Sequence, residues 1–405
     1  MSCATTLRCR RCAEDHPLEP APSCARCGGA LAPRYDLDRA RESLDTQAIA
    51  ARRGGIWRYE EVLPVADPTG LGGATGGTPL LRAPRLGRRL GLSNLHLKVE
   101  GASHPTASFK DRPVAVAVAA ALRFAYRIVA TPSTGNLANA VAAFARIAGL
   151  EHRAFVPEDL EETKVAGTAV FGPGLVRVRG SYDDARRLAA ESAKREGWAI
   201  VNVTLRPFYG EGSKTIAFEI AEQLGLVPRQ VILPMGSGLL LDRVDAGFRE
   251  WIDLGLSAGP PPRIFGVQAE GCSPIVRAFE KNEETLEPVR PRTIARSIAI
   301  GDPVSAREAL AAIRSSGGSA VAVPESEIVD GIRALAYTEG TFGETACGVT
   351  VAGAGILARR GDLDADAPTV LVLTGSGWKT AEALAGALSV PLVDPLPGEE
   401  RGRSG

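Results

Sequence analysis

The sequence has no excess of charge of either sign and no long hydrophobic run. Lysine and arginine together number 47, as do aspartate and glutamate, which argues against a broadly basic surface for nucleic acid or for an anionic membrane. No apolar stretch approaches the roughly 20 residues that span a bilayer. Residues 1–9 lack the apolar core of a secretion signal. We therefore expect a cytoplasmic protein whose partners include neither nucleic acid nor a membrane.

Cysteine is scarce beyond the N-terminus. Five of the seven cysteines lie in the first 27 residues, where Cys9-x-x-Cys12 and Cys24-x-x-Cys27 form two pairs separated by eleven residues. In a reducing compartment this pattern predicts a tetrahedral zinc site, and four thiolates leave the metal no open position for catalysis. We therefore predict structural Zn²⁺, with a lost metal site or a redox pair as the alternatives. His16 is interpreted as a loop residue.

From Thr78 onward the sequence alternates short apolar runs with amphipathic stretches. The apolar runs predict β-strands at residues 95–99, 128–130, 153–156, 175–178, 199–203, 231–234, 264–267, 320–323 and 370–373. Helical spacing is clearest at residues 136–149 and 325–338. This alternation predicts an α/β fold whose mainly parallel sheets are covered by helices on both faces. A length of 405 residues predicts at least two domains.

Two short motifs indicate a reactive lysine and an anion-binding turn. The segment 108–112 reads S-F-K-D-R and places Lys110 at the start of an apolar helix pattern, with Ser108 beside it. The segment 133–136 reads S-T-G-N and follows an apolar strand. A lysine amine beside a turn of anion-binding donors suits a pyridoxal-phosphate enzyme, because the amine bonds to the cofactor aldehyde and the turn holds a carboxylate. A solvated surface lysine is the alternative. Asp111 and Arg112 are expected to pair with the scaffold.

Two glycine-containing turns follow other predicted strands. Gly236-Ser237-Gly238-Leu239-Leu240 opens a helix after the strand at 231–234, a place where backbone N–H groups bind phosphate. Thr374 follows the strand at 370–373, and its hydroxyl is suited to a pyridine nitrogen. Asn136 is a candidate donor to a ring oxygen, with a helix N-cap as the alternative. The candidates for a second anion are Arg206, Tyr209, Lys214 and Lys164.

With these residues in hand, the chain resembles the threonine synthase family, which has the fold type II architecture of pyridoxal-phosphate enzymes. The segment 100–112 reads E-G-x-x-x-P-T-x-S-F-K-D-R, and it is similar to the lysine segment of that family. The other similar segments are residues 9–36, 55–59, 77–80, 133–136, 211–215, 266–272 and 374–379. The resemblance therefore covers nearly the whole chain.

The resemblance implies a role for each candidate residue. Lys110 is implied as the Schiff-base lysine and proton carrier, and Asn136 as the contact of the ring oxygen. The five residues from Gly236 to Leu240 would hold the cofactor phosphate, and Thr374 would face the pyridine nitrogen. The implied substrate contacts are Ser108, Ser133, Thr134, Arg206 and Lys214. The implied reaction converts O-phospho-L-homoserine and water into L-threonine and phosphate.

The resemblance also implies a division of the chain. Residues 1–36 would form a zinc-ribbon-like segment, and residues 37–100 an arm with the start of a large cofactor domain. Residues 101–205 would form a small α/β domain, residues 206–392 the rest of the large domain, and residues 393–405 a flexible tail. A homodimer is expected, with a small amino acid as the substrate.

The sequence departs from the family pattern mainly where the substrate phosphate would bind. Residues 104–107 read H-P-T-A, Leu239-Leu240 replaces further glycine, Ser376 replaces a frequent histidine, and Arg206 lies farther from Glu211 than usual. A related enzyme acting on O-phosphoserine, O-acetylserine or threonine is therefore an alternative. A zinc-ribbon adaptor with a decayed catalytic half is another, and the intact Lys110 speaks against it.

Overall fold

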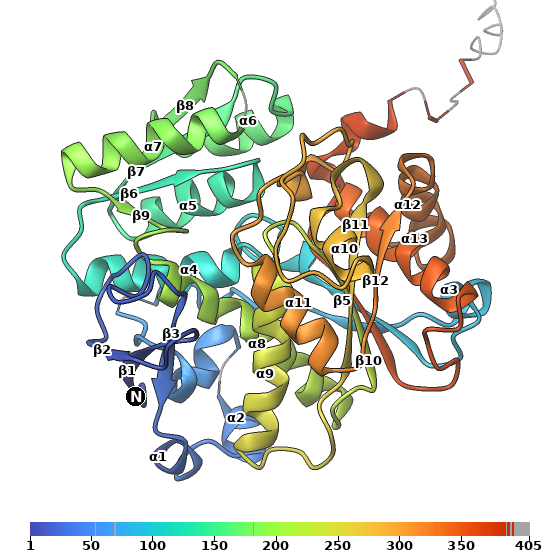
Figure 1. Ribbon diagram of the computed structural model, residues 1–405, viewed down its shortest axis with the longest axis horizontal. Coiled ribbons are helices and arrows are strands. Elements are labelled where there is room, and N and C mark those ends of the chain that lie inside the picture. The colour runs from blue at the N-terminus through green and yellow to red at the C-terminus, as the bar shows by residue number, and fades with distance from the viewer. Residues whose placement is uncertain (53, 69, 181, 386, 389–390, 393–405) are drawn as a thin grey trace, which may run out of the picture.

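Three separate β-sheets organise the chain in the computed structural model (Figure 1), which describes residues 1–405 except 53, 69, 181, 386, 389–390 and 393–405. The expected tail at 393–405 thus lies outside the described residues. The first sheet is small and antiparallel, with the order β2–β1–β3. It consists of β1 (Ala4–Cys9), β2 (Asp15–His16) and β3 (Leu31–Tyr35). The helices α1 (Leu37–Arg41) and α2 (Thr46–Ala51) follow it.

The largest sheet has six strands in the order β12–β11–β10–β13–β5–β4. Its strands are β4 (Leu80–Arg82), β5 (Leu95–Val99), β10 (Gln230–Pro234), β11 (Arg263–Ala269), β12 (Ala320–Val323) and β13 (Thr369–Leu373). All neighbours are parallel except β4, which runs antiparallel to β5 at the edge. Every residue of β10 and of β13 is buried, as expected of parallel strands covered on both faces.

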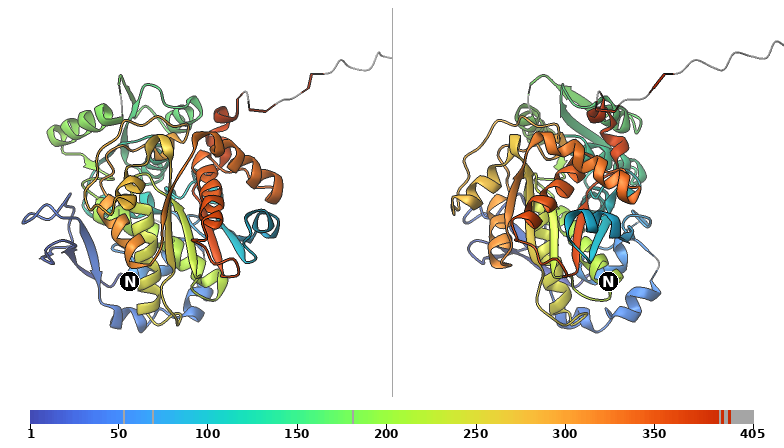
Figure 2. Two further views of the ribbon diagram at one scale, coloured as in Figure 1. Left: turned by 45° about the vertical axis from the view of Figure 1, so that its right-hand side comes forward. Right: turned by 90° about the vertical axis from the view of Figure 1, so that its right-hand side faces the viewer.

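Alternate residues of these strands pack into two different hydrophobic clusters. Val231 and Leu233 contribute to one cluster, together with residues of α8 (Arg206–Leu224), α9 (Leu239–Asp253), α10 (Pro274–Glu280) and α11 (Ala306–Ser315). Ile232 points to the opposite face and joins the cluster of α3 (Pro84–Leu90), α12 (Glu325–Glu339) and α13 (Thr345–Arg359). The six-stranded sheet is therefore covered by helices on both faces, and Figure 2 shows these layers from two further sides.

The third sheet has four parallel strands in the order β8–β7–β6–β9. They are β6 (Ile128–Pro132), β7 (Glu151–Pro157), β8 (Leu175–Val178) and β9 (Ala199–Ile200). The surrounding helices are α4 (Asp111–Arg123), α5 (Asn136–Ile147), α6 (Glu162–Ala169) and α7 (Tyr182–Glu196). The α/β fold with mainly parallel sheets, predicted from the alternating pattern, is confirmed.

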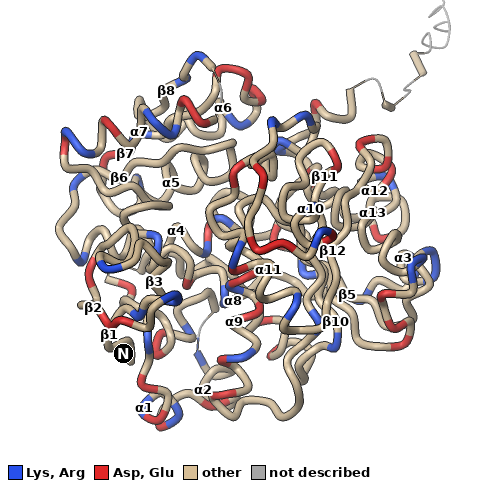
Figure 3. The backbone as a smooth tube through the Cα atoms, viewed as in Figure 1, with Lys and Arg blue, Asp and Glu red and all other residues tan. Residues whose placement is uncertain are grey.

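Each predicted strand is present, and one is shorter than predicted. The run at 199–203 reads as one apolar strand, but β9 ends at Ile200. The chain turns there because the amides of Val203 and Leu205 both donate to the carbonyl of Ile200. Charged residues of both signs are interspersed over the elements (Figure 3). Within the described residues, no helix combines the length and apolar character needed to cross a membrane.

Candidate active site

One cavity lies where the strands of the two parallel sheets end. Its walls come from segments that follow β6, β10 and β13 and from the start of α4, as expected for ligands of parallel sheets. Of the predicted site residues, those that line it are Lys110, Ser133, Thr134, Asn136, Arg206, Gly236, Ser237, Gly238, Leu239, Leu240 and Thr374. Residues from distant parts of the sequence thus meet in one place.

Lys110 occupies the N-cap position of α4 and points into this cavity. Its Nζ donates to the hydroxyl of Tyr209 at 3.0 Å and lies 4.5 Å from the centre of the Phe109 ring. Tyr209 is buried in α8 and lines the same cavity, so it fixes the position of the lysine amine.

The backbone joins the lysine segment to the turn that carries Thr374. The amide of Phe109 donates to the carbonyl of Thr374 at 2.9 Å, and the amide of Ser376 donates to the carbonyl of Ala107 at 3.0 Å. Ser108 forms an antiparallel bridge with Gly375 in the middle of this contact. These bonds fix Lys110 and Thr374 relative to each other.

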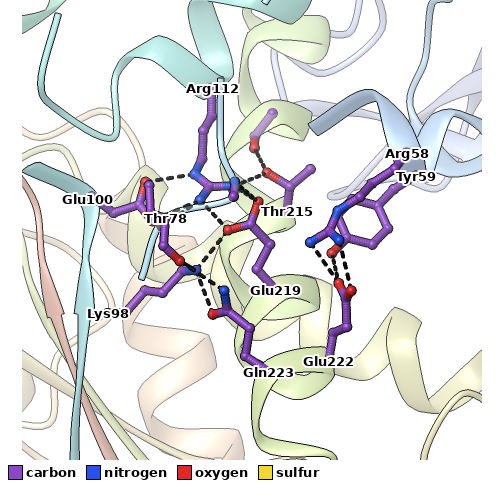
Figure 4. Close-up of polar contacts among 12 residues, drawn as sticks. Arg58, Tyr59, Thr78, Lys98, Glu100, Arg112, Thr215, Glu219, Glu222 and Gln223 are labelled. Carbon is purple, nitrogen blue, oxygen red and sulfur yellow. Dashed lines mark hydrogen bonds and ion pairs between the residues drawn. The ribbon is translucent and has the colours of Figure 1, made fainter. Parts of the chain in front are cut away.

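A fully buried charge network anchors the first turn of α4 (Figure 4). Arg112 donates to both oxygens of Glu100, at 2.6 and 2.9 Å, and to both oxygens of Glu219, at 2.8 and 2.6 Å. Lys98 donates to Glu219 at 2.7 Å. Burial opposes ionisation of Glu219, but Arg112 and Lys98 outweigh it and hold the pKa of this carboxyl far below its ordinary value. Arg112 thus pairs with the scaffold, as predicted.

The glycine-containing turn after β10 forms a cradle at the start of α9. Gly238 has φ +85°, and a Cβ there would lie 2.7 Å from the carbonyl oxygen of Ser305. A Cβ on Gly236 would approach the backbone of Ile298 to 3.2 Å. The free backbone N–H groups of a helix start bind phosphate. The geometry therefore fits the predicted cofactor phosphate.

The turn after β6 begins α5, and Ser133 rather than Asn136 stabilises that start. The hydroxyl of Ser133 accepts from the amides of Gly135 and Ala138, each at 2.9 Å. Asn136 is the first residue of the helix, so the alternative that it caps the helix is wrong. Its Nδ2 donates to Glu344 at 2.7 Å, and its Oδ1 is buried with no partner among the described residues. An unpartnered acceptor in a cavity wall fits a site that receives a polar ligand.

Two predicted substrate contacts lie outside the cavity. Lys214 is buried in α8, where its Nζ donates to Glu211 at 2.6 Å and to Glu250 at 2.9 Å and lies over the ring of Tyr35. Helical spacing turns it away from Tyr209 and toward the N-terminal sheet, so we no longer assign it to the substrate. Ser108 is fully buried and is not among the residues that line the cavity.

Arg206 does line the cavity, and its guanidinium is held by two residues that directly precede α11. Its Nη2 donates to the hydroxyl of Ser305 at 2.7 Å and to the carbonyl of Val304 at 3.1 Å. Burial lowers the pKa of Arg206 from its ordinary value, and the guanidinium keeps further donors for an anion.

Sequence reasoning missed Glu344, which is buried in the cavity wall directly before α13. A lone glutamate at a helix start is an ordinary feature of sequences, so no local signal distinguishes it. Lys379 ends the segment 374–379 that resembles the family, and the sequence predicts no role for it. Its Nζ donates to the carbonyl of Thr106 and to Oδ1 of Asn139, both at 2.7 Å, beside the cavity. Burial lowers the pKa of Lys379 to about 8.

The four predicted zinc ligands come together in the N-terminal sheet. The sulfur atoms of Cys9, Cys12, Cys24 and Cys27 all lie within 4.8 Å of one another. The Sγ atoms of Cys9 and Cys27 are 3.5 Å apart, close to the value of about 3.8 Å that four 2.3 Å zinc–sulfur bonds impose in a tetrahedron. His16 is not a loop residue but part of β2, and its Nε2 lies 3.2 Å from the sulfur of Cys24.

A model of the family described as "Pyridoxal-phosphate dependent enzyme" matches residues 71–375. The fold is shared with a processed threonine deaminase from Solanum lycopersicum, with a TM-score of 0.63 and 21% identity over 77% of this chain and 88% of that one. The chain thus belongs to the pyridoxal-phosphate-dependent enzymes.

The chain belongs to the threonine synthase family. It is 37% identical to the threonine synthase of Methanocaldococcus jannaschii over 95% of each chain. It is 35% identical to that of Methanosarcina acetivorans, over 96% of this chain and 95% of the relative. The resemblance inferred from the motifs is confirmed.

Proposed function

We propose that this protein converts O-phospho-L-homoserine and water into L-threonine and inorganic phosphate. The observation that carries the proposal is the convergence of Lys110, Asn136, Thr374 and the cradle at 236–240 on one cavity, in a chain similar to threonine synthases over nearly its whole length. Bound pyridoxal phosphate would supply an electron sink that stabilises negative charge at the substrate carbon atoms.

The residues that line the cavity would transfer protons and bind the substrate. Lys110 would bond to the cofactor and later move protons at the α and β carbons, with Tyr209 orienting its amine. Ser133 and Thr134 would hold the substrate carboxylate at the start of α5. Arg206 would bind the substrate phosphate, because a planar guanidinium matches phosphate oxygens in a bidentate contact.

Purified protein incubated with O-phospho-L-homoserine tests the proposal. Equal amounts of phosphate and L-threonine are expected, and none from Lys110→Ala, which removes the amine. Phosphate without threonine would instead show an eliminase that makes a keto acid. Neither product, from protein that still holds the cofactor, would overturn the proposal and favour O-phosphoserine, O-acetylserine or threonine as substrate.

Arg206→Ala tests the assignment of the substrate phosphate. The variant should weaken substrate binding much more than cofactor binding, since the guanidinium that it removes lines the cavity. The KM for the substrate and the Kd for the cofactor measure the two effects. Equal losses would contradict the assignment.

We also propose that Cys9, Cys12, Cys24 and Cys27 bind one structural Zn²⁺. Supporting this, all four thiols are free and adjacent, and a Cβ on Gly29 would lie 2.8 Å from the sulfur of Cys9. His16 would donate to the thiolate of Cys24, as outer hydrogen bonds commonly do at metal sites.

The zinc segment would brace the cofactor domain rather than take part in catalysis. Arg10, which lies between two of the ligands, forms an ion pair at 2.7 Å with Asp242 in the first turn of α9. Tyr35 donates to Glu211 of α8 at 2.8 Å. These contacts join the segment to the two helices beside the cavity.

We further propose the domain division at residues 1–36, 37–100, 101–205 and 206–392. It is supported by the sheets: the first sheet lies within 1–36, the four-stranded sheet within 101–205, and the six-stranded sheet is shared by 37–100 and 206–392. We also propose that the protein is a cytoplasmic homodimer and that it binds neither nucleic acid nor a membrane. Free thiols suited to a metal support a reducing compartment, and the balanced charge in Figure 3 supports the absence of a polyanionic partner. Light scattering of the purified protein tests the dimer.

A further inference from the structure

Arg10 joins the four-cysteine segment to the start of α9. It directly follows Cys9 in the sequence, and its backbone amide donates to the carbonyl of Ala30 at 2.9 Å, just beyond the second cysteine pair. Its Nη1 donates to both carboxylate oxygens of Asp242, at 2.7 and 2.8 Å. The backbone of Arg10 is therefore held within the cysteine segment, and its charge is held by α9.

Asp242 is the buried end of this contact. Its side chain is 4% exposed, whereas that of Arg10 is 35% exposed. Asp242 also accepts from Nε of Arg243 at 2.9 Å, and Arg243 donates to Glu211 of α8 at 3.0 Å. Burial opposes ionisation of Asp242, but Arg243 and Arg10 outweigh it and lower the pKa of this carboxyl from its ordinary value. Without Arg10, Asp242 would keep only one of its two cationic partners.

Asp242 lies in the helical turn that begins at the glycine-containing turn of the main cavity. Its amide donates to the carbonyl of Gly238 at 3.1 Å, which is the first bond of that helical turn. The N–H groups at the start of a helix have no partner within the helix, so their positions depend on this first turn. A shift of Asp242 would therefore also shift the donors at 236–240.

A small cavity lies between the cysteine segment and the main cavity. It has a volume of about 20 Å³, and the cysteine segment contributes Arg10 and Leu31 to its lining. Arg206, Leu239 and Ser305 line this small cavity and the main cavity as well. These three residues thus form a wall that the two cavities share, and the cysteine segment lies close behind it.

We propose that Arg10 is a positioning residue that couples metal binding at the four cysteines to the anion-binding turn at 236–240. Zinc bonds to the sulfur atoms fix the backbone of residues 9–12, and Arg10 transmits this restraint to Asp242. When the metal is removed, the restraint is lost and the first turn of α9 becomes more mobile. This inference rests on the proposed zinc and cofactor sites, and it does not depend on the identity of the substrate.

A comparison of zinc-loaded protein with protein stripped by a chelator tests the coupling, with the metal content of each sample measured. Stripping should weaken the binding of added pyridoxal phosphate at least about twofold. Without cofactor, it should speed hydrogen exchange in peptides that cover the start of α9. Arg10→Met should show weaker binding and faster exchange even with zinc bound, and stripping should change neither further. A residue that only stabilised the fold would leave the response to stripping intact.

Three further variants make the result specific. Arg11→Met is the matched control, because Arg11 also lies between the ligands but donates to the carbonyl of Cys27 within the segment, at 3.3 Å. Tyr35→Phe removes the contact of the N-terminal sheet with α8. Both should keep the full response to stripping. Asp242→Asn breaks the ion pair from the side of α9, without a change in the cysteine segment, and should behave like Arg10→Met.

The possible failures are distinguishable. A full response to stripping in Arg10→Met and Asp242→Asn, or no response in wild-type protein that has lost its zinc, would overturn the inference. Wild-type protein that never binds zinc would refute the metal site and the coupling with it. Threonine formation by the wild type is measured separately, so a failed inference is distinguished from a failed assignment of function.

Discussion

Replacing Arg112 by methionine should destabilise the protein strongly. The arginine side chain is fully buried, with its charge shared between Glu100 and Glu219. It also donates to the hydroxyls of Thr215 and Thr78, each at 3.0 Å (Figure 4). Methionine fills much of the volume but donates to none of these groups. The variant therefore leaves buried acceptors without their partner.

The structure allows the loss to be estimated. Glu219 keeps Lys98 at 2.7 Å, so one carboxylate remains compensated. Among the described residues, Glu100 keeps the hydrogen bond from the hydroxyl of Thr78 but loses its ion pair, and so it becomes the more poorly compensated of the two carboxylates. Breaking a buried pair by removing one partner costs about 3–5 kcal/mol. That is a large part of the roughly 5–15 kcal/mol that stabilises an ordinary domain.

Urea unfolding measures this effect. Arg333→Met is the matched control, because Arg333 and Asp330 form a pair whose side chains are 46% and 68% exposed, and such pairs contribute about 0–1 kcal/mol. Adding Glu100→Gln to Arg112→Met should restore part of the stability by removing the unpaired charge. If Arg112→Met costs no more than Arg333→Met, the reasoning about the buried network is wrong.

Three further predictions follow from other parts of the molecule. The pKa of Lys379 is near 8 in the folded protein, and its ordinary value is near 10.5. The buried, protonated ammonium therefore lowers the free energy of unfolding below pH 8. Stability should rise by at most about 3 kcal/mol between pH 8 and 10.5 relative to Lys379→Met, and parallel pH curves would contradict this. Gly238→Ala should weaken cofactor binding about tenfold or more. The control is Gly255→Ala, because Gly255 has a similar φ but no atoms near its added Cβ, and it should leave cofactor binding unchanged. Equal cofactor affinities of the two variants would refute the role of the turn at 236–240. Metal analysis should find about one zinc per chain, lost in Cys24→Ser, and a folded wild type without metal would refute the site.

The sequence by itself determined the elements and the class of chemistry. Strand and helix patterns depend on residues close together in the chain, so β5 and α12 were predicted nearly to the residue. Turns such as the one at 236–238 have local requirements that glycine reveals. The spacing of the paired cysteines likewise predicts the four-cysteine cluster, because two residues between the members of each pair already bring those two sulfur atoms close together.

Only the tertiary structure decided which polar side chains share the cavity. Lys214 and Tyr209 lie on the same helix, yet Lys214 faces Glu211 and Glu250 whereas Tyr209 faces Lys110. Glu344 lies more than 200 positions from Asn136 in the sequence and meets it only because two sheets end at one place. Such contacts depend on the packing of whole layers, which local patterns do not encode.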